Sequence, residues 1–96
     1  MAHELIWSPD SRYDLRELAD YIAEADPAAA RAFIQNIFNS VERLRDFPQS
    51  GRIVPEFEDP ELREVIKRPC RIVYRIRSGA VEIVRVWHSA RGIPNI

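Results

Sequence analysis

Seven basic residues in the last third of the chain could act together on an anionic substrate. They lie between positions 63 and 91 and are Arg63, Lys67, Arg68, Arg71, Arg75, His88 and Arg91. A guanidinium gives bidentate hydrogen bonds to a phosphate or a carboxylate, and an imidazole exchanges a proton near neutral pH. Such a set could perform acid–base chemistry on a phosphodiester, with the arginines stabilising the charge that develops.

Each of these residues also has an ordinary structural interpretation. For Arg75 we favour an ion pair with Glu82 on the neighbouring strand, because opposite charges often face one another across a sheet. For His88 and Arg91, catalysis and a structural role at the end of a strand are about equally supported. The sequence contains no phosphate-binding glycine loop, nucleophile motif or metal-ligand spacing, so we expect neither a metal nor a cofactor.

A β-hairpin must position most of these basic residues. The runs CRIVYRIR and VEIVRVWH are rich in β-branched and aromatic residues, and Ser78–Gly79 between them predicts a two-residue turn. This register places Arg75 opposite Glu82, Val73 opposite Val84 and Arg71 opposite Val86. Alternation then predicts a core face with Cys70, Ile72, Tyr74, Ile76, Val81, Ile83, Arg85 and Trp87. The other face would carry Arg71, Val73, Arg75, Glu82, Val84, Val86 and His88.

Two helices precede the hairpin. Ser8 and Pro9 are suited to the cap and first position of a helix that runs to about Glu24. Asp26 and Pro27 repeat the signal and begin a second helix, which should end near residue 46 before the breakers in FPQSG. Because the break between the helices is so short, they must form an antiparallel hairpin.

The complete element order predicts an α+β domain, β-α-α-β-β-β, with the helical hairpin on one face of a mostly antiparallel four-stranded sheet. The additional strands are His3–Trp7 and Leu62–Ile66. Residues 47–60 should form an ordered surface loop, and Gly92–Ile96 a loose terminus. We expect the second face of the sheet to stay uncovered and, together with the groove beside the helical hairpin, to receive a partner.

Composition limits the class of protein. With 96 residues, 46% of them apolar and 30% charged, the chain fits one globular domain spanning residues 1–96. Cys70 is the only cysteine, which fits a reducing cytoplasm, and no apolar run is long enough for a membrane span. Residues 1–46 carry five arginines and nine acidic residues, a balance of −4, whereas residues 47–96 carry nine basic and six acidic residues, +3. The basic half suits an anionic target or an acidic partner.

The order of short motifs along the chain resembles the RelE/ParE toxin superfamily. The motifs are Pro9-Asp10…Asp14-Leu15, Ala30…Phe33-Ile34, Phe47-Pro48…Gly51-Arg52, Leu62-Arg63-Glu64, Arg71-Ile72-Val73-Tyr74-Arg75 and Val86-Trp87-His88…Arg91. The resemblance covers nearly the whole chain and implies the fold deduced above. It also implies the toxin of a type II toxin–antitoxin pair, a class also called plasmid stabilisation proteins, neutralised by an antitoxin that an adjacent gene encodes. A homodimer, or a heterotetramer with the antitoxin, is compatible with it.

The superfamily divides in activity. ParE-like members inhibit DNA gyrase, and RelE-like members cleave messenger RNA on the ribosome. Here the paired lysines and the C-terminal tyrosine of the RelE pattern are absent, which favours the ParE branch and growth inhibition through gyrase. In the alternative, a ribosome-dependent endoribonuclease, the resemblance implies catalysis by Arg71, His88 and Arg91. Contacts to the target or the antitoxin would involve Arg63, Lys67, Arg71, Arg75, His88 and Arg91.

Overall fold

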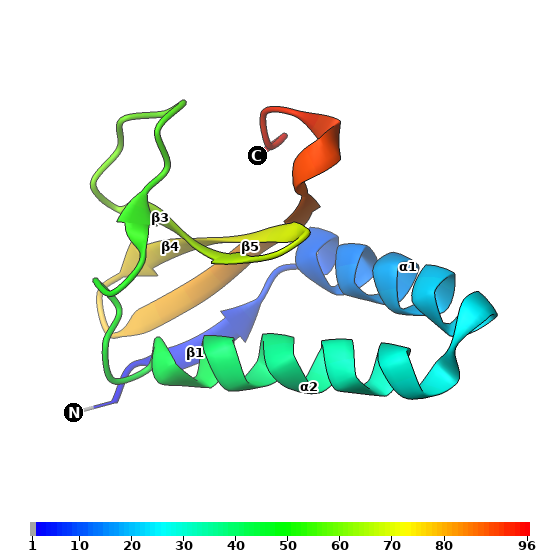
Figure 1. The fold of residues 1–96 in the computed structure, drawn as a ribbon. Helices are drawn as coiled ribbons and strands as arrows, with labels where there is room; N and C mark the ends of the chain where they lie inside the picture. Colours follow the sequence, from blue (N-terminus) through cyan, green and yellow to red (C-terminus); the bar gives the residue numbers. More distant parts are fainter. Residues whose placement is uncertain (1) are drawn as a thin grey trace.

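Two helices cover one face of a five-stranded sheet in the computed structural model, which describes residues 2–96 (Figure 1). The elements are β1 (Glu4–Trp7), α1 (Pro9–Ala25), α2 (Pro27–Arg43), β2 (Arg52–Ile53), β3 (Leu62–Lys67), β4 (Cys70–Arg77), β5 (Ala80–His88) and the 3₁₀ helix η1 (Ser89–Arg91). The strand order is β1-β5-β4-β3-β2, with β1 parallel to β5 and the other pairs antiparallel. The α+β prediction is confirmed. The short strand β2, which the sequence did not indicate, raises the strand number from four to five.

The helices begin where their capping residues predict. The Ser8 hydroxyl accepts a hydrogen bond from the Ser11 amide at 3.0 Å, and Asp26 accepts from Ala28 and Ala29 at 3.0 and 3.2 Å. Helix α2 ends at Arg43, slightly earlier than expected, because a turn follows it directly. No helix among residues 2–96 has the length and apolarity that a membrane crossing requires.

The main core lies between the helices and the sheet. From α2 and the residue that follows it, the core receives Ile37, Val41 and Leu44, each at most 1% exposed. The sheet contributes fully buried or nearly buried residues on the face toward the helices, namely Cys70, Ile72, Tyr74, Val81, Ile83 and Val86. The predicted core face is therefore confirmed along the whole of β4 and on β5 as far as Ile83.

A β-bulge changes the register in the second half of the hairpin. Arg77 pairs with Ala80 and Arg75 lies opposite Glu82, as the turn predicts, but the register shifts between Val73 and Tyr74. Beyond it, Ile72 lies opposite Val86, Arg71 opposite Trp87 and Cys70 opposite His88.

The predicted pairings of Val73 with Val84 and of Arg71 with Val86 are thus wrong. Because a shift of one residue exchanges the faces of a strand, Val86 and His88 lie on the helix-facing side. Arg85 and Trp87 lie on the opposite side, with Arg71 and Val73. The assignment of Arg85 and Trp87 to the main core was therefore also wrong.

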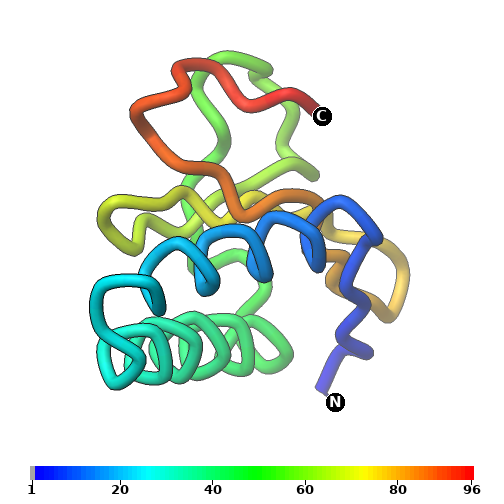
Figure 2. The backbone as a smooth tube through the Cα atoms, turned by 90° about the vertical axis from the view of Figure 1, so that its right-hand side faces the viewer, coloured from blue at the N-terminus to red at the C-terminus, as the bar shows by residue number. Residues whose placement is uncertain are grey.

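The middle of the sheet face opposite the helices is covered, contrary to expectation, whereas Arg77 and Ile6 on the same face stay exposed. Figures 1 and 2 show that the segment between β2 and β3 and the C-terminal segment lie over it. Val54, from the segment between β2 and β3, is fully buried and forms a second, smaller core with Leu62, Val73 and Val84. The C-terminal segment is also held, because its Gly92 carbonyl accepts a hydrogen bond from Trp87 Nε1 at 3.1 Å.

Candidate functional site

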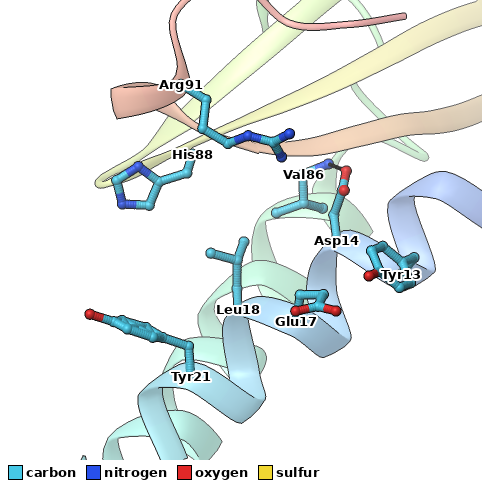
Figure 3. Close-up of a pocket in the computed structure, with 8 residues that line it drawn as sticks. All are labelled: Tyr13, Asp14, Glu17, Leu18, Tyr21, Val86, His88 and Arg91. Carbon is cyan, nitrogen blue, oxygen red and sulfur yellow. Dashed lines mark hydrogen bonds between the residues drawn. The ribbon is translucent and has the colours of Figure 1, made fainter.

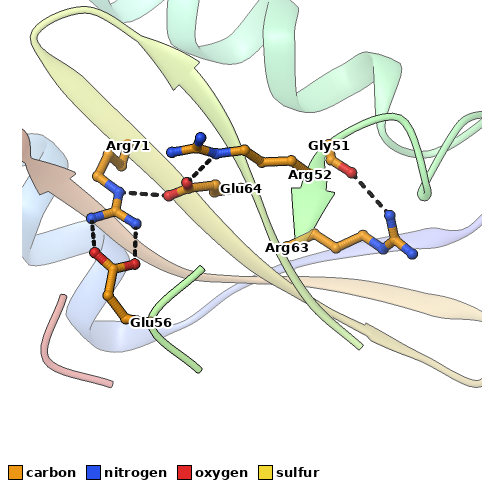
Figure 4. A network of polar contacts seen from close by, with 6 residues as sticks. All are labelled: Gly51, Arg52, Glu56, Arg63, Glu64 and Arg71. Atoms are coloured by element: carbon orange, nitrogen blue, oxygen red, sulfur yellow. Dashed lines mark hydrogen bonds and ion pairs between the residues drawn. The ribbon is translucent and has the colours of Figure 1, made fainter. Parts of the chain in front are cut away.

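Arg71 lies at the centre of an ion network that the chain itself completes (Figure 4). Its Nε donates to Glu64 at 2.6 Å, and its two terminal nitrogens donate to the two oxygens of Glu56 at 3.0 and 2.7 Å. The second Glu64 oxygen accepts from Arg52 Nε, also at 2.6 Å. The Arg71 guanidinium is 10% exposed and the Glu64 side chain is fully buried. All three nitrogens of the Arg71 guanidinium therefore contact carboxylates of the same chain.

The charges in this network stabilise one another. The hydrogen bond from Arg71 lowers the pKa of Glu56, and the same contact raises the pKa of Arg71. Two arginines and two glutamates give a net charge of zero. Arg71 thus pins the segment between β2 and β3 to the sheet, since Glu56 belongs to that segment.

Arg63 and Arg75 also hold this segment. Arg63 donates from Nε to the Pro60 carbonyl at 3.1 Å and from Nη1 to the Gly51 carbonyl at 3.0 Å. Arg75 lies opposite Glu82 in the sheet, but its ion pair is with Asp59 at 3.4 Å. The predicted Arg75–Glu82 ion pair is therefore wrong. Glu82 pairs instead with Arg77, at 3.1 Å. Lys67 is exposed at the end of β3.

His88 and Arg91 line a cleft of about 440 Å³ on the side of helix α1, here called the α1 cleft (Figure 3). Its lining residues are Tyr13, Asp14, Glu17, Leu18, Tyr21, Val86, His88 and Arg91. His88 Nδ1 accepts a hydrogen bond from the Ala90 amide at 3.1 Å, so the proton of the neutral ring is on Nε2. The Arg91 guanidinium lies 4.1 Å from the centre of the Trp87 ring, a cation–π contact.

Asp14 fixes the geometry of the α1 cleft. Its carboxylate accepts two hydrogen bonds from Arg85, each 2.8 Å long, and one from the Val86 amide at 3.0 Å. Asp14 is 5% exposed, and the hydrogen bonds that it accepts from Arg85 raise the pKa of Arg85. It thus ties helix α1 to the part of β5 that β1 does not pair with, because β1 ends opposite Ile83.

The basic residues that the sequence singled out are divided between two faces. Arg71 projects to the side covered by residues 54–61, whereas His88 projects to the helix-facing side. The bulge thus places Arg71 and His88 on opposite faces of the sheet. The Arg71 guanidinium is already bound by Glu56 and Glu64. Within residues 2–96, no group of three or more His, Cys, Asp or Glu side chains is arranged to hold a metal ion.

Sequence reasoning missed the acidic partners that organise both regions. Glu56 falls within residues 47–60, for which the sequence predicts only an ordered surface loop, and Glu64 and Asp14 enter only through the motifs of the resemblance. The available signal was the position of Glu64 in a short alternating strand, where a buried carboxylate requires a cationic partner. Gly51 also matters: a Cβ there would lie 2.5 Å from the Tyr74 hydroxyl, which accepts a hydrogen bond from the Gly51 amide at 3.0 Å.

Comparison with known proteins identifies the family. The family model described as "ParE toxin of type II toxin-antitoxin system, parDE" matches residues 5–93. Toxin RelE2 of Caulobacter vibrioides is 29% identical over 89 residues, which cover 92% of this chain and 97% of that protein. Putative toxin Y4kP of Sinorhizobium fredii is 32% identical over 92 residues, covering 94% and 92%.

A solved structure has the same fold. A chain of the chromosomal ParDE toxin–antitoxin system from P. aeruginosa superposes with a TM-score of 0.74 at 24% identity, covering 91% of this chain and 96% of that one. The match to the family model extends from β1 past the end of the 3₁₀ helix. It includes the ion network around Arg71 and the α1 cleft. The chain therefore belongs to the ParE toxin family of type II toxin–antitoxin systems.

Proposed function

We propose that this toxin inhibits DNA gyrase by binding it, without catalysis of its own, and that a cognate antitoxin neutralises it in the cytoplasm. One observation carries the non-enzymatic part of the proposal. Of the three groups that a nuclease would use, Arg71 is separated from His88 and Arg91, since Glu56 and Glu64 bind its guanidinium and the bulge turns His88 to the other face of the sheet. A phosphate stabilised by Arg71 would have to displace a bidentate carboxylate.

The antitoxin-binding surface that fits best is the α1 cleft. Tyr13 and Tyr21 are 62% and 71% exposed beside it, so two aromatic side chains are available for a partner. Aromatic and arginine side chains are the groups that most often dominate binding energy at protein interfaces. Arg91 adds a cation at the cleft wall, opposite Asp14 and Glu17 on helix α1, which suits a mainly apolar antitoxin segment with one acidic residue placed at Arg91. The α1 cleft lies beside the helical hairpin, where part of the docking surface is expected from the sequence. The sheet face, the other part of that expectation, is largely covered by residues 54–61 and the C-terminal segment.

A binding experiment can test the antitoxin surface. The toxin is co-expressed with the product of the adjacent gene, and Tyr21→Ala is compared with Arg31→Ala, an exposed position on α2 outside the cleft. We expect Tyr21→Ala to weaken the complex and Arg31→Ala to leave it unchanged. Equal affinity of the two variants would exclude the α1 cleft as the main contact.

Gyrase inhibition is tested with purified components. The toxin should reduce DNA supercoiling by gyrase or increase gyrase-dependent DNA cleavage, and an excess of antitoxin should reverse the effect. Arg91→Glu reverses a charge at the mouth of the α1 cleft, and Arg31→Glu is the matched charge reversal elsewhere. If gyrase works normally at toxin concentrations that stop growth, the target is a different one.

The second candidate is ribosome-dependent cleavage of messenger RNA. It is favoured by the orientation of His88, since the Ala90 amide fixes the ring with its Nε2 proton free to donate. In this case His88→Ala should abolish transcript cleavage in arrested cells, while DNA damage signalling stays low. A cleavage pattern that persists in His88→Ala would remove His88 from the reaction.

A further inference from the structure

A second cleft lies at the end of the sheet where β3, β4 and η1 meet. It has a volume of about 600 Å³, and we call it the basic cleft. Its lining residues are Arg52, Ile66, Arg68, Pro69, His88, Ser89 and Ala90. Two arginines, a histidine and a serine are thus among the residues of one concave surface, and none of the seven residues is acidic. His88 lines both clefts, but the α1 cleft differs, since Asp14 and Glu17 line it beside Arg91.

Arg52 is anchored through one nitrogen of its guanidinium. Its Nε donates to Glu64 at 2.6 Å, and no hydrogen bond within residues 2–96 uses its two terminal nitrogens. The Arg52 side chain is 58% exposed, whereas the Glu64 side chain below it is fully buried. Glu64 is also the partner of Arg71, so a buried carboxylate orients Arg52 while the outer edge of its guanidinium faces solvent.

The remaining donors of the basic cleft come from other elements. Arg68 is exposed in the turn between β3 and β4, and among residues 2–96 it forms no ion pair. His88 has its proton on Nε2, because Nδ1 accepts from the Ala90 amide. The Ser89 amide donates to the Pro69 carbonyl at 2.9 Å. This hydrogen bond joins η1 to the turn between β3 and β4.

We propose that the basic cleft binds a phosphate group carried by a nucleotide or a nucleic-acid strand. A phosphate offers several acceptor oxygens, so it can satisfy donors from separate elements at once. The volume fits a nucleotide-sized ligand, since small-molecule sites occupy roughly 300–1,000 Å³. Ile66, 41% exposed, and Pro69 supply an apolar wall that suits a sugar or base better than an isolated ion.

The charge distribution limits the contact to one or two phosphates. The first 46 residues carry a balance of −4, and they form β1 and the two helices. A long polyanion lying across that half would be repelled, so it can approach only at the basic end of the sheet. For a single strand, each neutralised phosphate contributes roughly −0.7 to the slope of log affinity against log salt. We therefore expect a shallow slope of about −0.7 to −1.4.

Nuclear magnetic resonance titration of the intact chain can test the site. Inorganic phosphate, adenosine 5′-monophosphate and a short single-stranded oligonucleotide are added separately, and an acidic peptide serves as the competing ligand class. Signals of Arg52 Nε–H, the His88 ring and the Ser89 amide should shift with the phosphate ligands. Comparison of the three phosphate arms shows whether the phosphate alone, the nucleoside or a strand determines affinity.

Variants decide whether the cleft is responsible. Arg68→Ala removes an exposed donor without touching the Glu64 network, so its melting temperature should equal that of the wild type. It should lower affinity for the preferred phosphate ligand about tenfold, the loss expected for one charged hydrogen bond. Arg31→Ala, the control on α2, should bind normally. The proposal is overturned by equal affinity in these two variants, by no shift with any phosphate ligand, or by tighter binding of the acidic peptide. None of these readouts requires gyrase, so the test stands apart from the proposed target.

Discussion

The replacement of Arg71 by alanine tests whether this residue holds the fold together. The change leaves the fully buried Glu64 with one partner, Arg52, whose side chain is 58% exposed. It also removes both hydrogen bonds to Glu56, which hold the segment between β2 and β3 on the sheet. Val54 and Val73, both fully buried, lose part of their cover when that segment loosens.

The expected loss in the free energy of unfolding is large, because Arg71 is 8% exposed and its partner Glu64 is buried. Removal of one partner of a buried ion pair typically costs about 3–5 kcal/mol. Because Arg52 still contacts Glu64, we expect the lower end, a loss of about 3 kcal/mol in the free energy of unfolding. For a domain of this size, about 4–8 °C per kcal/mol converts this loss to a fall in melting temperature of roughly 12–24 °C.

Urea and thermal unfolding of the purified chain measure this effect. Arg77→Ala is the matched control, since Arg77 lies on the same strand and pairs with Glu82 through a side chain that is 57% exposed. An exposed pair of this kind contributes about 0–1 kcal/mol. A double variant, Arg71→Met with Glu64→Leu, removes both buried charges and should recover much of the lost stability.

Two results would refute the reasoning. If Arg71→Ala and Arg77→Ala change the free energy of unfolding equally, the network does not hold the fold together. If Arg71→Ala keeps full stability but loses toxicity, Arg71 acts on the target, and the case against a catalytic arginine fails.

Three further predictions follow from contacts in the main core and the ion network. Gly51→Ala should destabilise the fold, because its Cβ would come within 2.5 Å of the Tyr74 hydroxyl and 2.6 Å of the Glu64 carbonyl; chemical unfolding measures this. The pKa of Glu56 is lowered from 4.5 by Arg71, so its stabilising contribution is complete above pH 4.5 and lost as pH falls through the lowered value. Glu56→Gln should therefore flatten the acid side of the stability profile, and an unchanged profile would argue against this contact. Burial raises the pKa of the Cys70 thiol to about 11, so a thiol reagent at pH 8 should label it only when the chain unfolds, and rapid labelling of the folded chain would contradict its burial.

Local signals in the sequence determined the elements of this protein. Ser8–Pro9 and Asp26–Pro27 start helices because a side chain accepts the first free amides and proline suits the first position. The Ser78–Gly79 turn sets the register as far as Tyr74, since turn geometry controls the nearest pairs. Motif order was enough to identify the superfamily. The capping and turn signals act between residues close together in the chain.

Tertiary contacts decided which residues share a site. The bulge near Val84 breaks the alternation, and residues far away in sequence support it: the Ser8 hydroxyl donates to the Val84 carbonyl, and Asp14 accepts from the Val86 amide. That single shift moved His88 to the α1 cleft and left Arg71 on the other face. Likewise, only the path of the segment between β2 and β3 brought Glu56 to Arg71. Periodicity cannot predict such contacts, because they depend on the three-dimensional path of segments that have no periodic pattern of their own.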